Sequence, residues 1–338
     1  MFVALDETEK FVIASEKLDK NQNFLCPVCR KSVQLKMGTH SRPHFAHFTK
    51  SIHTKKREGE TNEHREGKET LYYWSRQKTE INVELEPYIS SIDQRPDVLI
   101  ESKLAFEIQC SPISIQQLTK RCVEYQKIGI SPIWFCGKKL HINEKLSDLN
   151  RALMNYAKNI GFYYWEIHQQ KQQIRLLFNI EETLDHKIHY DTFCISFNQM
   201  PIQKVLKLPQ FISKLSPRKY EDEKIIAHFY RELQQKLYFK DRRIIQLQEK
   251  FYQQKQNLLD LPKYYYYPVI RPLFCAEEAI SWKFSFYNFL KNHKVASNFQ
   301  FNKQMKLHST PLISKKTLLN HFINQEMVNL RNFRKLKN

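Results

Sequence analysis

The stretch that decides the fold reads Arg95-Pro96-Asp97-Val98-Leu99-Ile100-Glu101-Ser102-Lys103-Leu104-Ala105-Phe106-Glu107-Ile108-Gln109-Cys110. Two apolar runs flank a short polar break, which predicts a β-hairpin. A turn centred on Ser102 makes Asp97 the cross-strand partner of Glu107, with Cβ atoms roughly 4.5–5.5 Å apart. Two carboxylates this close repel each other unless a cation lies between them. The pair therefore predicts a site for a hard cation.

Side chains alternate along both strands, so the hairpin has a packing face and a polar face. Gln109 lies two residues after Glu107 and shares its face. Pro96 has no amide hydrogen and marks the start of a strand. The opposite face carries four apolar residues that suit a core: Val98, Ile100, Phe106 and Ile108. A surface turn with an incidental acid pair is the alternative interpretation.

The 338-residue chain is strongly basic, with a formal net charge of +19 and a pI near 9.5. Proteins this basic commonly bind polyanions such as DNA, RNA or an anionic membrane, and we expect a nucleic acid as the partner. The alternative is a soluble protein whose composition is biased by an AT-rich genome. The sequence has no P-loop or dinucleotide-binding motif. It also has no apolar run long enough for a membrane span and no export signal, which favours a cytoplasmic protein with reduced cysteines.

Hydrophobic patterns predict the elements around the hairpin, and their order is typical of an α/β core. The expected strands lie within residues 1–15 and at 80–89, 130–136, 162–168 and 173–179. The expected helices cover 61–77, 114–127 and 145–159, and the second begins with a capping box from Ser114 to Gln117. A long helix or helical hairpin is expected over 216–258, and a basic, mostly helical segment follows to residue 338.

A second constellation lies nearer the N-terminus, where Cys26-Pro27-Val28-Cys29 is followed by His44-Phe45-Ala46-His47 on a compact, loop-rich segment. Two thiolates (Cys26, Cys29) and two imidazoles (His44, His47) in close pairs are the ligand set of a structural zinc site. His40 is a competing ligand, because His40 and His44 also fit H-x3-H. The alternative is a pair of reduced cysteines beside surface histidines.

The helix predicted to begin at Thr61 has a charged face. Glu60, His64 and Lys68 follow each other at i, i+4 spacing. Glu60 or Glu63 could supply a third carboxylate to the acid pair. His64 could orient a phosphate or a water molecule, or it could be a solvated surface histidine.

The helix after the hairpin carries Arg121 and Tyr125 one turn apart. An arginine can bind a phosphate through two hydrogen bonds, and a tyrosine hydroxyl can donate to it. The alternative is an ordinary pair on the helix surface.

The motif Pro96-Asp97, followed after nine residues by Glu107-Ile108-Gln109, resembles the PD-(D/E)xK nuclease pattern, with Gln109 at the lysine position. More narrowly, the chain is similar to the competence protein CoiA family, strongly over residues 1–140 and weakly beyond about 180. The matching residues are Phe2-Val3-Ala4, Cys26-Pro27-x-Cys29, His44-Phe45-Ala46-His47, Gly59-Glu60-x-x-x-His64, Arg95-x-Asp97, Phe106-Glu107-Ile108-Gln109-x-Ser111, Arg121, Tyr125 and Ile133-Trp134.

The resemblance implies a restriction-endonuclease-like enzyme that acts in natural transformation, after DNA entry and before or during recombination. It implies Asp97, Glu107 and Gln109 as the catalytic set, with Glu60 as the helical carboxylate. Asp97 and Glu107 would hold Mg²⁺ or Mn²⁺.

Glutamine has no charge and no usable pKa, so Gln109 departs from the usual lysine. Metal-bound water could supply the nucleophile, or a cation from elsewhere could substitute. Otherwise catalysis is lost and DNA binding remains. The candidate substitutes are Lys68, Lys120 and Arg121.

The sequence thus predicts an α/β (α+β) restriction-endonuclease-like core at 57–170, a small zinc-binding β module at 1–50 and a basic helical C-terminal domain at 171–338. The expected function is a divalent-metal-dependent DNA nuclease that processes internalised, single-stranded or branched DNA for recombination. The alternative is a catalytically weak or inactive DNA-binding mediator that assists the recombinase. The residues expected to contact DNA are Lys68, Arg121 and Tyr125.

Overall fold

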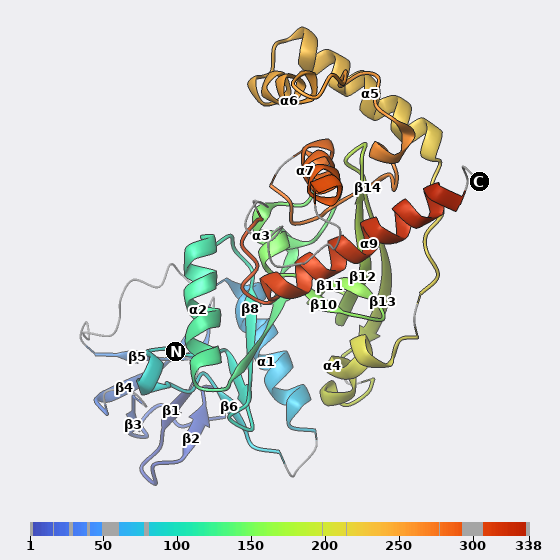
Figure 1. Ribbon diagram of the computed structural model, residues 1–338. Coiled ribbons are helices and arrows are strands. Elements are labelled where there is room, and N and C mark those ends of the chain that lie inside the picture. Colours follow the sequence, from blue (N-terminus) through green and yellow to red (C-terminus); the bar gives the residue numbers. More distant parts are fainter. Residues whose placement is uncertain are drawn as a thin grey trace.

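The computed structural model describes residues 3–15, 17–26, 30–38, 41–48, 61–77, 81–197, 199–213, 215–276, 278–292 and 307–335. Two separate β-sheets and several helices make up this part of the chain (Figure 1). The fold is therefore mixed α/β, as the sequence predicts. None of the helices in the described ranges is long and apolar enough to span a membrane.

The N-terminal sheet has five strands in the order β2-β1-β3-β4-β5. The two strands predicted within residues 1–15 are confirmed, but the segment from Cys26 to His47 is not loop-rich, because β4 and β5 pair as antiparallel strands. Buried Phe24, Val33 and Phe45 belong to its small core. The strands are β1 (Val3–Leu5), β2 (Phe11–Ile13), β3 (Phe24–Leu25), β4 (Ser32–Gly38) and β5 (Ser41–His47).

The larger sheet has nine strands, seven of which follow the order β13-β12-β11-β9-β8-β7-β6. Strands β8, β9 and β11 are parallel to one another, and the remaining pairings are antiparallel. These strands are β6 (Val83–Leu85), β7 (Val98–Ile100), β8 (Leu104–Gln109), β9 (Ser131–Cys136), β11 (Gly161–His168), β12 (Gln173–Thr183) and β13 (Ile188–Ser196). Two short strands complete it: β10 (Asn155–Ala157) on β11 and β14 (Ile270–Arg271) on β12.

The predicted hairpin is confirmed with its register. Val98 pairs with Phe106 and Ile100 with Leu104, and the turn between them contains Glu101 and Ser102, both with positive φ. The packing face is also as predicted. The opposite face was predicted to be polar and to hold a cation, and on it Leu99 and Ala105 are buried with Tyr125. A parallel βαβ crossover covers the sheet with its helix, so this hairpin is buried on both faces.

Helices cover both faces of the larger sheet. On one face, α1 (Asn62–Ser75) and α4 (Ile202–Phe211) contribute to a core with Phe106 and Ile108. The other face carries α2 (Ile115–Lys127), whose predicted capping box between Ser114 and Gln117 is present. The helix expected at 145–159 is wrong, because α3 (Asp148–Ala152) is a short helix and β10 follows it.

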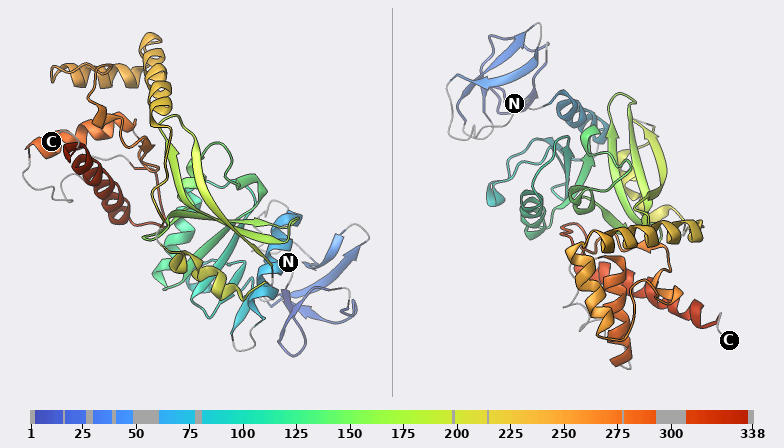
Figure 2. Two further views of the ribbon diagram at one scale, coloured as in Figure 1. Left: turned by 90° about the vertical axis from the view of Figure 1, so that its right-hand side faces the viewer. Right: turned by 90° about the horizontal axis from the view of Figure 1, so that it is seen from above.

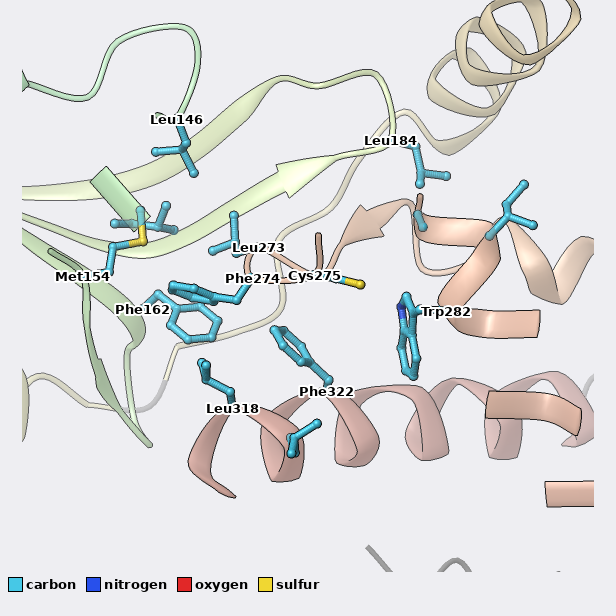
Figure 3. Packing of buried hydrophobic residues seen from close by; sticks show 14 of the residues in the cluster. Leu146, Met154, Phe162, Leu184, Leu273, Phe274, Cys275, Trp282, Leu318 and Phe322 are labelled. Carbon is cyan, nitrogen blue, oxygen red and sulfur yellow. The ribbon is translucent and has the colours of Figure 1, made fainter. Parts of the chain in front are cut away.

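The C-terminal helices share a core with the sheet. Helices α5 (Asp222–Tyr238) and α6 (Arg242–Tyr252) form the predicted helical hairpin, and α7 (Ala279–Asn292) and α9 (Lys315–Lys335) follow. In Figure 3, Phe162 of β11 lies near Phe274 and near Leu318 and Phe322 of α9. The predicted boundary at residue 170 falls between β11 and β12 of this sheet, which also includes β14, and the C-terminal helices share one buried core with it.

Candidate active site

The candidate active site lies where the β7–β8 hairpin meets the first turns of α1. Continuing the observed register by one pair places Asp97, just before β7, opposite Glu107 in β8. The cleft here has a volume of about 370 Å³. Its polar lining residues are Thr61, His64, Lys68, Glu86, Arg95, Asp97, Gln109, Ser111 and Arg121.

Asp97 is held by two neighbours through one carboxylate oxygen. Its Oδ2 lies 3.1 Å from His64 Nε2 and accepts the amide hydrogen of Ile108 at 2.8 Å. Burial favours the neutral acid, but His64, Lys68 and the Ile108 amide outweigh it and hold the pKa of Asp97 below its ordinary value. Asp97 is therefore a carboxylate at neutral pH.

Glu107 is more deeply buried, with 1% of its surface exposed. Its Oε1 accepts hydrogen bonds from Arg121 and Tyr125 of α2, both at 2.5 Å. Burial raises the pKa of Glu107 to about 7 despite the positive charge of Arg121, and the negative charge of Asp97 adds to the rise. The two acids thus repel each other electrostatically, as the sequence predicts.

Three side-chain oxygens of this face have no protein partner among the described residues: Asp97 Oδ1, Glu107 Oε2 and Gln109 Oε1. Gln109 uses its amide nitrogen to donate to the Ser111 carbonyl, which fixes the side chain and leaves its oxygen available. Mg²⁺ and Mn²⁺ prefer oxygen ligands. The chemistry of this donor set therefore fits such a cation.

Lys68 lies one helical turn after His64 and also lines the cleft. Its side chain is 2% exposed and its ammonium group forms a buried ion pair with Glu86. The positive charge of Lys68 also helps to lower the pKa of Asp97. The positive charge of Lys68 therefore stabilises the Asp97 carboxylate electrostatically, while its ammonium group is paired with Glu86.

Two family models match this chain. The CoiA nuclease-like domain matches residues 60–210, and the CoiA N-terminal domain matches residues 8–52. Together the two matches span more than half of the chain.

This chain belongs to the competence protein CoiA family.

A curated relative is the competence protein CoiA of Bacillus subtilis (strain 168), which is 34% identical over 150 residues. That stretch is 44% of this chain and 38% of the relative, so the likeness covers less than half of either protein. No solved structure matches. The residues of the cleft all lie within the match to the CoiA nuclease-like domain.

The structure brings together most of the residues predicted for this site of the CoiA-family protein, with two corrections. Tyr125 is fully buried and donates to Glu107, so it supports a carboxylate and does not contact DNA. The ammonium group of Lys68 is paired with Glu86 and is not exposed to bind a phosphate. Glu60 lies outside the described residues. Glu63 accepts the amide hydrogen of Lys138 and is not among the cleft residues.

Removing the Tyr125 hydroxyl should destabilise this CoiA-family protein. Tyr125→Phe keeps the ring but takes one hydrogen bond from a buried carboxylate, so we expect the free energy of unfolding to fall by about 1–3 kcal/mol. Urea denaturation followed by circular dichroism measures the loss. Tyr73→Phe is the control, since Tyr73 is largely exposed. Equal stability of the two variants would contradict the role given to Tyr125.

Three of the predicted zinc ligands, Cys26, His44 and His47, lie in or beside the strands of the small N-terminal sheet. Strand β5 pairs with β4 so that His47 lies opposite buried Val33, whereas His44 lies opposite Lys36. Side chains three residues apart on a regular strand point to opposite faces, so in a regular β5 His44 and His47 would not share a face. Cys29 and the competing His40 lie outside the described residues. The four-ligand zinc site therefore stays a prediction of the sequence.

The sequence interpretation missed two groups of polar residues. Glu86, which ends the strand before the hairpin, gives no local sign that it pairs with Lys68. His141, Glu166 and His168 gather at the end of β11, and the alternation of Glu166 and His168 on one strand could have indicated them. Glu166 already accepts from Arg175 and from the Ile142 amide, so its oxygens are occupied by the protein.

Proposed function

We propose that this protein is a divalent-metal-dependent DNA nuclease that processes internalised DNA for recombination during natural transformation. The observation that carries the proposal is the facing pair Asp97 and Glu107, each with one carboxylate oxygen bound by the protein and one left for a cation. The nuclease-like domain assigned by the family model and the +19 charge support DNA as the substrate.

Mg²⁺ or Mn²⁺ would be held by Asp97 and Glu107, and it supplies Lewis-acid stabilisation of the charge that develops on the phosphate. Hydrogen bonds within the protein orient the side chains around this cation position. Gln109, fixed by its bond to the Ser111 carbonyl, presents an oxygen that can accept a hydrogen bond from the attacking water. His64 holds Asp97 in place and lines the cleft.

The positive charge that lysine supplies in related nucleases has to come from another residue here. Lys120 is exposed and is not part of the cleft lining. Arg121 lines the cleft and is partly exposed, so it can reach a phosphate while it holds Glu107. We propose Lys68 as the substitute for the lysine and Arg121 as the DNA-contacting residue.

Cleavage of single-stranded or branched DNA by the purified protein should require Mn²⁺ or Mg²⁺ and stop when EDTA is added. Because the pKa of Glu107 is raised to about 7, cation binding must displace a proton below that pH. We therefore expect half-maximal cleavage to need more Mn²⁺ at pH 6 than at pH 8. Cleavage that persists in EDTA, or a cation requirement that does not change with pH, would contradict the proposal. RNA of the same sequence tests the weaker substrate alternative.

A second candidate function is a DNA-binding mediator that assists the recombinase without cleaving. The observation that favours it is the position of Glu107, which is nearly fully buried, is tied to Arg121 and Tyr125, and is absent from the cleft lining. If no DNA structure is cut at any cation concentration while binding is tight, the mediator function replaces the nuclease.

A further inference from the structure

The α5–α6 helical hairpin projects from the body of the molecule. Figure 1 and the left-hand view of Figure 2 place it at the end opposite the N-terminal sheet. The turn between the two helices reads Tyr238-Phe239-Lys240-Asp241-Arg242-Arg243, and all six residues are exposed. Asp241 caps the first turn of α6 by accepting the amide hydrogens of Arg243 and Ile244, so the turn has a defined shape.

Two aromatic side chains at this turn, Tyr238 and Phe239, are exposed to solvent. Tyr238 is 82% exposed and Phe239 is 77% exposed, and the two rings meet edge to face with centroids 5.2 Å apart. Exposing two neighbouring aromatic rings forfeits the stabilisation that their burial would give, which makes a binding role the natural explanation. Lys240, Arg242 and Arg243 surround them, and these side chains form no ion pair with any described residue.

A cation-lined hollow begins at the same turn. Arg243 lines a depression of about 510 Å³ together with Lys250 of α6 and with Arg151 and Arg271 from the body of the protein. Two acidic residues, Glu182 and Glu278, also line it. Arg151 and Arg271 both pair with Glu182, whereas Arg243 and Lys250 form no ion pair with any described residue. The cations of the hollow that are left for a phosphate are therefore those of α6, beside the aromatic tip.

We propose that the α5–α6 tip is a second nucleic-acid site, at which Tyr238 and Phe239 stack on unpaired bases while Arg242, Arg243 and the hollow behind them bind the phosphates. Aromatic rings beside arginine and lysine form the usual platform for single strands, because every base has a face to stack on. The site lies apart from the cleft of Asp97, so it extends the proposed nuclease function and does not depend on cleavage.

Nucleic acid is favoured over a membrane or a protein partner by the charge of the tip. Three of its six residues are cationic and one is acidic, in a chain whose net charge is +19. An acidic protein surface would also attract these cations, but its carboxylates do not stack on aromatic rings, whereas each base of a single strand offers a face for stacking. An anionic membrane would accept two aromatic side chains, and vesicles therefore form a separate arm of the test.

The test compares oligothymidylate of about 20 nucleotides with an abasic sugar–phosphate oligomer of the same length, by fluorescence anisotropy in EDTA. The full-length Y238A/F239A double variant should bind oligothymidylate about 10- to 100-fold more weakly, because stacking contributes about 1–3 kcal/mol per base. Its affinity for the abasic oligomer should not change. An R242Q/R243Q variant should bind both oligomers more weakly and show a smaller salt dependence.

Tyr252→Ala is the matched control, since Tyr252 is 55% exposed on the same hairpin but lies at the far end of α6. Circular dichroism checks that all variants fold. An affinity for oligothymidylate within twofold of wild type in Y238A/F239A would overturn the proposal, as would an equal loss on the abasic oligomer. Loss of binding to anionic vesicles with unchanged DNA binding would assign the tip to a membrane. Because EDTA prevents cleavage, these results are independent of the nuclease proposal.

Discussion

Asp97→Asn should reduce cation-dependent cleavage of DNA by about 10³-fold or more while DNA binding stays near the wild-type level. The asparagine keeps the size of the side chain and can still accept the Ile108 amide hydrogen. It lacks the negative charge that a divalent cation requires, and it leaves Glu107 without the facing carboxylate. Cleavage is measured on single-stranded and branched DNA with Mn²⁺, and binding is measured on the same DNA in EDTA.

The matched control is Asp93→Asn, four residues upstream in the same connection. Asp93 is exposed and accepts a hydrogen bond from the Tyr88 hydroxyl, and it has no place in the cleft. This variant should cleave like the wild type. If Asp97→Asn retains more than a tenth of the wild-type cleavage, the cation is held elsewhere and the proposed site is wrong.

Lys68→Met should impair both stability and cleavage. Removing one partner of a buried ion pair leaves an uncompensated charge on Glu86, so the free energy of unfolding should fall by about 3 kcal/mol. Loss of the positive charge beside Asp97 should lower cleavage by about 10²-fold if Lys68 substitutes for the usual lysine. Urea denaturation and a single-turnover cleavage assay measure the two effects.

A double variant separates these two effects. Lys68→Met combined with Glu86→Gln replaces the ion pair by neutral side chains, so most of the stability should return while cleavage stays low. Lys120→Met, on the exposed surface of α2, should change neither quantity. Full cleavage by the folded double variant would remove Lys68 from the mechanism and leave Arg95 and Arg121 as the remaining cationic side chains of the cleft lining.

The hairpin could be predicted with its register because the signals are local. An alternating apolar pattern and a three-residue polar break determine which residues of the two strands face each other. The start of the next helix is likewise predicted by a local signal, the capping box between Ser114 and Gln117. The packing of α2 over the hairpin face that carries Asp97 and Glu107 could not be predicted from such local signals. It follows from the parallel pairing of β8 with β9, which brings together residues about 27 positions apart.

The errors also have physical causes. The segment from Ser41 to His47 contains proline and no β-branched residue, yet pairing with β4 makes it a strand and separates the two histidines. Strand β13 was missed because most of its side chains are not buried, so it lacks the apolar alternation of its neighbours. The ion pair of Lys68 with Glu86 joins a helix to a strand end and has no sequence signature.

The common core of the sheet and the C-terminal helices limits how this protein can be shortened. A fragment that stops at residue 210 would keep the whole nuclease-like match and every cleft residue. It would also lose Phe274, Leu318 and Phe322, and with them the cover over Phe162 on the sheet. Such a fragment would present a bare apolar surface to solvent and tend to aggregate. Truncation experiments on the nuclease-like domain therefore need the complete chain, or polar replacements on that surface.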